Sequence, residues 1–206
     1  MIRVAYYSYF ENNKFSNYEQ KVHILQTINI FMLSKLLSSK ERIKVLEYVI
    51  YRDSFKVTEV SKELSLSKGF VSEYLNFLYE NKIIGKNKAY KYKNNPLTNS
   101  IKLMLNINKI NISKIKKSFI KGIGLYGSWA DGTNMYDSDL DIWIKTDKYP
   151  DENEMAIISK TLRQMTNSEV QLLVLTPAKL EQIKKDKPFF SSLYYKSIIL
   201  WGEPIE

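Results

Sequence analysis

A Gly-Ser pair and an Asp-x-Asp pair at a fixed spacing are the residues of this sequence best suited to chemistry. Gly127 and Ser128 are followed, after ten intervening residues, by Asp139 and Asp141. Apolar residues at 140, 142 and 144 alternate with these aspartates and Trp143, a period of two that predicts a β-strand. The two carboxylates should therefore share one strand face, about 7 Å apart.

This pattern predicts a site for a metal-bound nucleoside triphosphate. Paired carboxylates can hold Mg²⁺ or Mn²⁺, because hard divalent cations prefer oxygen ligands. Two such metals can stabilise the attacking and the leaving oxygens of an in-line displacement. Gly127 lets the backbone approach a polyphosphate closely, and Ser128 can donate hydrogen bonds from its amide and its hydroxyl.

The segment from Gly127 to Asp141 resembles the DNA polymerase beta-type nucleotidyltransferases, in particular the minimal nucleotidyltransferases. The resemblance lies in the spacing of the two motifs and in Ala130, Gly132 and Ser138. The resemblance covers residues 119–203. It implies a small α/β domain on a short mixed sheet that uses Mg²⁺ and ATP or another nucleoside triphosphate. It also implies transfer of a nucleoside monophosphate, AMP in the case of ATP, to a hydroxyl of a protein, an RNA or a small molecule.

One position departs from the family pattern. Active members carry a third carboxylate on a later strand, and in the run from 169 to 176 that position falls on Gln171. Glu169 lies two residues earlier and so shares the face of Gln171. Glu169 either completes the site as a metal ligand and general base, or is an ordinary charged residue at a strand start. In the second case the domain binds nucleotide but is catalytically weak.

Residues 119–206 supply the elements that would position this site. Strands are expected on either side of the Gly-Ser turn, followed by an amphipathic helix from Asp151 to Met165. Thr176 and Pro177 should start a further helix, since Thr caps helices well and Pro suits the first turn. A short strand at 198–202 would close the domain.

The N-terminal part of the chain differs strongly in charge. Residues 1–118 contain 21 basic and 9 acidic residues, whereas residues 119–206 contain 10 basic and 13 acidic residues. This asymmetry indicates a basic half that faces a polyanion and an acidic half that holds metal.

Residues 38–95 resemble winged-helix transcription regulators. Three helices are expected, the last of them capped by Ser67, and an alternating hairpin with Tyr90 and Tyr92 should follow. Such a unit would place its last helix in the major groove of double-stranded DNA and its hairpin lysines on phosphates. The expected DNA contacts are Lys68, Ser72, Asn76, Lys86, Lys88, Lys91 and Lys93. A winged helix used for protein contact or dimerisation is the alternative.

The remaining segments are less specific. Residues 1–37 form an N-terminal extension with an apolar helix around Ile28 that could support a homodimer, and residues 96–118 form a linker helix and connector. The sequence has no cysteine and therefore no disulfide or thiolate metal site. It contains neither a long apolar run nor a signal-peptide core, so we expect a cytoplasmic protein without a membrane partner.

The expected fold class combines α+β and α/β: a mostly α winged helix-turn-helix with a β-hairpin wing, then a small mixed-sheet domain. The expected function is metal-dependent nucleotidyl transfer coupled to DNA binding. The alternative is a DNA-binding transcriptional regulator whose weak transferase domain senses nucleotide. Gln171 favours the second interpretation, and Glu169 would favour the first.

Overall fold

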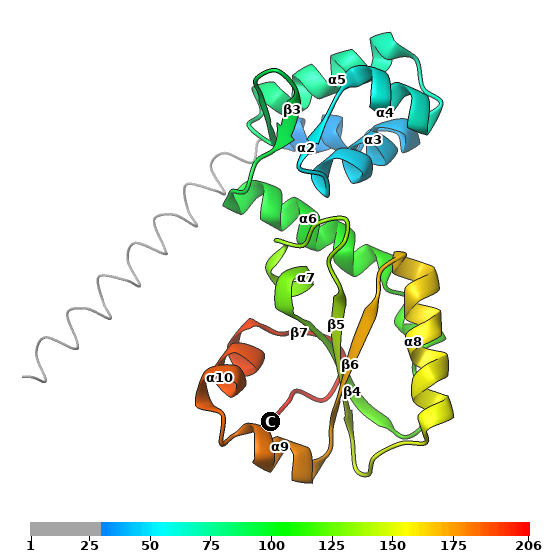
Figure 1. The fold of residues 1–206 in the computed structure, drawn as a ribbon, viewed down its shortest axis with the longest axis vertical. Coiled ribbons are helices and arrows are strands. Elements are labelled where there is room, and N and C mark those ends of the chain that lie inside the picture. Colours follow the sequence, from blue (N-terminus) through cyan, green and yellow to red (C-terminus); the bar gives the residue numbers. More distant parts are fainter. Residues whose placement is uncertain (1–29) are drawn as a thin grey trace, which may run out of the picture.

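Helix α6 (Pro96–Lys109) lies between two units in the computed structural model, which describes residues 30–206 (Figure 1). The helix starts with a capping box between Asn95 and Thr98, and Pro96 occupies its first turn. Both features satisfy or remove backbone donors that have no partner within a helix. A short 3-10 turn, η1 (Ile112–Lys114), follows it.

From residue 30 onward, the N-terminal unit combines four helices with a small antiparallel sheet. Its elements are α2 (Ile30–Leu36), α3 (Lys40–Ile50), β1 (Ser54–Phe55), α4 (Val57–Leu64), α5 (Lys68–Glu80), β2 (Ile84–Lys86) and β3 (Tyr90–Tyr92). The strand order is β1-β3-β2. The side chain of Ser67 accepts a hydrogen bond from the amide of Phe70 at the start of α5, so this predicted helix cap is confirmed.

One apolar cluster holds the N-terminal unit together, and α6 belongs to it. Val45, Leu75 and Ile84 are fully or almost fully buried there, together with Ile101 and Leu105 of α6. The expected dimerisation helix falls mostly on residues outside the described range. The part that is described, α2, buries Met32 in this same cluster, with 5% of its surface exposed.

The C-terminal unit is built on a four-stranded mixed sheet, as the sequence predicts. Its elements are β4 (Ile120–Tyr126), α7 (Gly127–Asp131), β5 (Leu140–Thr146), α8 (Glu152–Thr166), β6 (Val170–Leu175), α9 (Pro177–Ile183), α10 (Lys187–Lys196) and β7 (Ile198–Gly202). The strand order is β6-β5-β4-β7, and only the β5–β6 pair is parallel. The cap expected at Thr176 is present, and the helix expected from Asp151 is capped by the side chain of Asp151.

The two faces of this sheet pack against different helices (Figure 1). Ile142 and Ile144 share a cluster with Ile158 and Leu162 of α8. Trp143 faces the other way and packs with residues of α9 and α10. Because side chains alternate along a strand, Asp139 and Asp141 lie on the Trp143 side.

None of the helices described in residues 30–206 combines the length and the hydropathy needed to cross a bilayer.

Candidate active site

Asp139 and Asp141 lie at the start of β5, one of the two central strands of the sheet, and solvent reaches both side chains. Asp141 pairs in register with Tyr126 at the end of β4, and both side chains are half-buried. Burial, and to a smaller extent the carboxylate of Asp139, raises the pKa of Asp141. Burial raises the pKa of Tyr126 to about 12, and the charge of Asp141 adds to this effect. Burial and the like charge of Asp139 therefore act on the pKa of Asp141 in the same direction.

Gly127 lies directly against the second aspartate. A Cβ atom at this position would be 2.2 Å from Oδ2 of Asp141, and the φ angle of Gly127 is +66°. Both the left-handed backbone and the close approach require glycine. The Gly-Ser pair and the Asp-x-Asp pair, separated by ten residues in sequence, are thus in contact in space.

Ser128 closes the turn that connects the two motifs. Its backbone carbonyl accepts hydrogen bonds from the amides of Gly132, Thr133 and Asn134, the last two at 2.9 and 3.2 Å. These bonds fix the chain between α7 and β5. The hydroxyl of Ser128 lies on a half-buried residue in the first turn of α7.

Gln171, and not Glu169, lies beside the aspartate pair. Gln171 is the register partner of Asp141 in the parallel β5–β6 pair, and its Nε2 donates a hydrogen bond of 2.7 Å to Oδ2 of Asp139. The Glu169 carboxylate instead forms a 2.7 Å ion pair with Arg163 of α8, and its side chain is 69% exposed. Within residues 30–206 no three Asp, Glu, His or Cys side chains gather as a metal cluster.

The donor set nevertheless fits a magnesium-bound triphosphate. Mg²⁺ is commonly held by one or two protein carboxylates together with oxygens of the substrate phosphates. Asp139 and Asp141 supply two such carboxylates, since they lie two residues apart on one strand face. When bound, the metal would neutralise phosphate charge and polarise the phosphoryl group.

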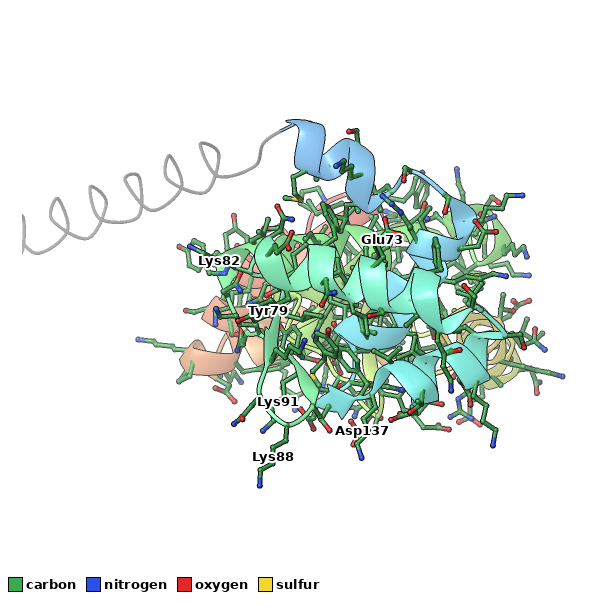
Figure 2. The ribbon with its side chains drawn as sticks, turned by 90° about the horizontal axis from the view of Figure 1, so that it is seen from above. Glu73, Tyr79, Lys82, Lys88, Lys91 and Asp137 are labelled. Carbon is green, nitrogen blue, oxygen red and sulfur yellow. The ribbon has the colours of Figure 1, made fainter. Side chains whose placement is uncertain are left out.

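The lysines expected to contact DNA lie on the surface of the N-terminal unit. Lys68 is exposed in the first turn of α5, and Ser72 is half-buried one turn later. The four hairpin lysines, Lys86, Lys88, Lys91 and Lys93, are all exposed. Lys88 and Lys91 project outward from the hairpin, whereas Glu73 projects from α5 (Figure 2).

Asn76 has an internal partner that the sequence did not reveal. The hydroxyl of Tyr90 donates a 2.8 Å hydrogen bond to Oδ1 of Asn76. Tyr90 is itself buried and stacks on Phe55. This bond ties α5 to the hairpin, so the side chain expected to contact bases also holds the unit together.

A further group of polar residues behind the site was missed from the sequence. Thr98, Lys102 and Asn106 are all fully buried on α6, and Asn134 of the connecting turn is 1% exposed. The first three recur at a spacing of four, which places them on one side of a helix. This spacing could have indicated a shared polar face of the helix from the sequence alone, but the apolar residues between these positions made it hard to see.

Comparison with known families gives a match that includes most of the C-terminal unit. The family model "Polymerase beta, Nucleotidyltransferase" matches residues 90–191, a range that contains Gly127, Ser128, Asp139 and Asp141. By this domain the chain is a transferase, as its sequence predicts. The match starts at residue 90 and not near 119, so it includes helix α6, which was expected to be a linker.

Comparison with solved structures gives weaker likenesses. A tri-AMPylated Shewanella oneidensis HEPN toxin in complex with MNT antitoxin matches at 22% identity over 49% of this chain and 73% of that chain, with a TM-score of 0.34. A toxin-antitoxin structure with AMP-PNP matches at 25% identity over 48% and 74%, with a TM-score of 0.37. Both TM-scores are below 0.5. A search of curated proteins finds no match.

Proposed function

We propose that the C-terminal unit binds a magnesium-bound nucleoside triphosphate, ATP in the first instance, and transfers the nucleoside monophosphate to an acceptor hydroxyl. The observation that carries this proposal is the contact between Gly127 and Asp141 within the matched nucleotidyltransferase range. It supports a single site in which donors for the phosphates and carboxylates for the metal lie side by side. Mn²⁺ has the same ligand preference and could replace Mg²⁺.

Each of the four motif residues has a distinct role in this proposal. Asp139 and Asp141 hold the metal through their carboxylates. Gly127 keeps the backbone close enough to Asp141 for the phosphates to approach the metal, and Ser128 donates hydrogen bonds to the phosphate oxygens. The carboxylates would also position the acceptor hydroxyl for in-line attack on the α-phosphorus, with pyrophosphate as the leaving group.

Gln171 supports a second candidate, a nucleotide-sensing domain with weak catalysis. Its amide donates to Asp139 at 2.7 Å, in the position where a third carboxylate would otherwise lie. An amide cannot accept the proton of the acceptor hydroxyl, and general-base catalysis typically contributes about 10²- to 10⁴-fold. Glu169 could supply that base only after leaving Arg163.

We further propose that the N-terminal unit is a winged helix-turn-helix that binds double-stranded DNA. The order of α3, α4 and α5 followed by the β2–β3 hairpin supports this assignment. Exposed Lys68 in the first turn of α5 and the four exposed hairpin lysines support contact with phosphates. The exposed carboxylate of Glu73 on α5 opposes phosphate binding and would limit affinity.

Labelled ATP distinguishes the two candidate functions of the C-terminal unit. The full chain is incubated with Mg²⁺ and ATP labelled at the α- or the γ-phosphate, with and without cell extract. Nucleotidyl transfer moves only the α-label to an acceptor and releases pyrophosphate. Transfer of α-label that is lost in Asp139→Asn would support the enzyme.

The matched control is Asp137→Asn, which removes a nearby exposed carboxylate outside the Asp-x-Asp pair. This variant should transfer label like the wild type. If the wild type binds ATP with Mg²⁺ but transfers no α-label, the sensing function is favoured. If neither binding nor transfer is detected, the proposed site is wrong.

A further inference from the structure

Helix α6 carries a stripe of polar side chains that are completely removed from solvent. Thr98, Lys102 and Asn106 each have 0% of their surface exposed. Buried polar groups are costly unless they are hydrogen-bonded, and a buried ammonium is more costly still. Burial lowers the pKa of Lys102 to about 8, against a smaller opposing effect of Asp53. Such a stripe is expected to have a specific partner.

The partner on one side is the turn between the Gly-Ser and Asp-x-Asp motifs. The ammonium of Lys102 donates to the backbone carbonyl of Asn134 at 2.6 Å. The side-chain amide of Asn106 donates to the carbonyl of Trp129 and to Oδ1 of Asn134, both at 2.9 Å. Gly132 lies so close to α6 that a Cβ atom there would be 2.1 Å from the carbonyl oxygen of Asn99.

The partner on the other side is the N-terminal unit. The hydroxyl of Tyr51, the residue that ends α3, donates to Oδ1 of Asn106 at 2.9 Å. The backbone carbonyl of Tyr51 also accepts from the amide of Tyr136 at 2.9 Å. The ammonium of Lys102 lies 3.8 Å from the ring centre of Tyr92 in β3. The same two side chains of α6 thus contact both units.

We infer that Tyr51, Lys102 and Asn106 are positioning residues for the nucleotide site. Through them the N-terminal unit holds in place the turn between the Gly-Ser and Asp-x-Asp motifs. This inference rests on the proposed function of that site. The turn runs from Ser128 to Asp139, and both ends contribute to the site. Because metal and phosphate ligands must be held within about 0.5 Å of their working geometry, loss of these bonds should loosen the site without removing any ligand.

Two tyrosine variants test the inference with a matched control. Tyr51→Phe removes the hydroxyl that donates to Asn106, whereas Tyr92→Phe removes a hydroxyl that donates to Asn99 of the same helix at 2.7 Å. Both substitutions keep the aromatic ring. Hydrogen–deuterium exchange of residues 127–141 is measured in the full chain, with α5 as internal reference, and the dissociation constant of Mg²⁺–AMP-PNP is measured by calorimetry.

We expect Tyr51→Phe to raise exchange of the turn amides and to weaken nucleotide binding, each about fivefold, since one net hydrogen bond is lost. Tyr92→Phe should change neither, and α5 should be unaffected in both. Lys102→Met should have a larger effect in the same direction if the variant folds. Equal turn exchange in Tyr51→Phe, Tyr92→Phe and wild type would overturn the inference.

The two readouts separate this inference from the proposed function. Nucleotide binding that is missing in the wild type itself counts against the proposed site. Exchange of the turn still shows whether the N-terminal unit restrains it. Faster exchange in Tyr51→Phe together with unchanged nucleotide affinity would show a structural contact that does not support the site, and would reject the positioning role.

Discussion

The sheet of the C-terminal unit and the surface of the N-terminal unit both carry the side chains singled out from the sequence, but they arrange them differently. On the sheet, Gly127 contacts Asp141, and Gln171 donates to Asp139 and lies in register with Asp141. On the N-terminal unit, the lysines expected to contact DNA are all exposed. The first arrangement is a candidate site with defined geometry, whereas the second is a charged surface.

This difference decides how each region should respond to change. In a site of converging ligands each residue is needed, because one misplaced group spoils the geometry for the others. On an exposed basic surface each lysine contributes a similar amount through phosphate charge. Single substitutions should therefore be severe on the sheet and mild on the N-terminal unit.

The largest effect is expected from Asp139→Asn. The substitution keeps the shape of the side chain and leaves an oxygen for the Gln171 amide, but removes the charge that would hold the metal. Transfer of the α-label should fall by about 10²- to 10³-fold, comparable to removal of one preorganised electrostatic partner of a transition state. Initial rates at saturating ATP and Mg²⁺ measure it. A loss below about threefold would mean that Asp139 is not a ligand.

Gln171→Glu should act in the opposite direction. It places a carboxylate in register with Asp141 and removes the amide that now bonds to Asp139. If the missing general base limits the reaction, the rate should rise about 100-fold, near the lower end of such contributions. The rate is compared with that of Glu169→Gln, which should stay near wild type because Glu169 pairs with Arg163. A severe loss in Glu169→Gln would show that Glu169 is the working base.

The parts of the site that were predictable from sequence depend on local patterns. Period two along one strand placed Asp139 and Asp141 on the same face, and the faces of Ile142 and Trp143 confirm that alternation. The cap at Ser67 is likewise a local signal. A local signal can still leave a choice between neighbours: Ser38 and Ser39 both precede α3, and the side chain of Ser39 caps it.

The parts that were not predictable depend on contacts between distant segments. Gln171 meets Asp139 because β6 pairs with β5 after the chain has passed through α8. No local pattern fixes that register, and only the resemblance to the family placed Gln171 at the position of the third carboxylate. Arg163 draws Glu169 away from the aspartates for the same reason. On the N-terminal unit, the bond between Tyr90 and Asn76 depends on how the hairpin folds onto α5.

On the N-terminal unit, removal of two charges should have a moderate effect. Lys88→Gln with Lys91→Gln removes two hairpin lysines that project outward (Figure 2). If both contact phosphates, the slope of log affinity against log salt should become shallower by about 2, and affinity at moderate salt should fall about tenfold. Salt titrations on a mixed-sequence duplex measure this. The control is Lys148→Gln with Lys160→Gln on the C-terminal unit. An equal loss of DNA affinity in this control would show that net charge, and not contact by the hairpin, causes the effect.

The smallest effect is expected from Asp141→Asn on stability in the absence of metal. Burial and Asp139 raise the pKa of Asp141, so the folded state binds its proton more tightly than the unfolded state. Unfolding free energy must then fall as pH rises from the ordinary aspartate range through the raised pKa. The variant lacks this loss, and at neutral pH it should melt higher than wild type, within about 2 °C because solvent screens a partly exposed charge.

Adding Mg²⁺ and AMP-PNP should reverse the order of the melting temperatures, because the ligand should stabilise only the wild type. The hairpin variant of the N-terminal unit should show neither change. If instead Asp141→Asn lowers the melting temperature without metal, the carboxylate stabilises the fold. The aspartate pair and the basic surface of the N-terminal unit would then not differ in their effect on stability.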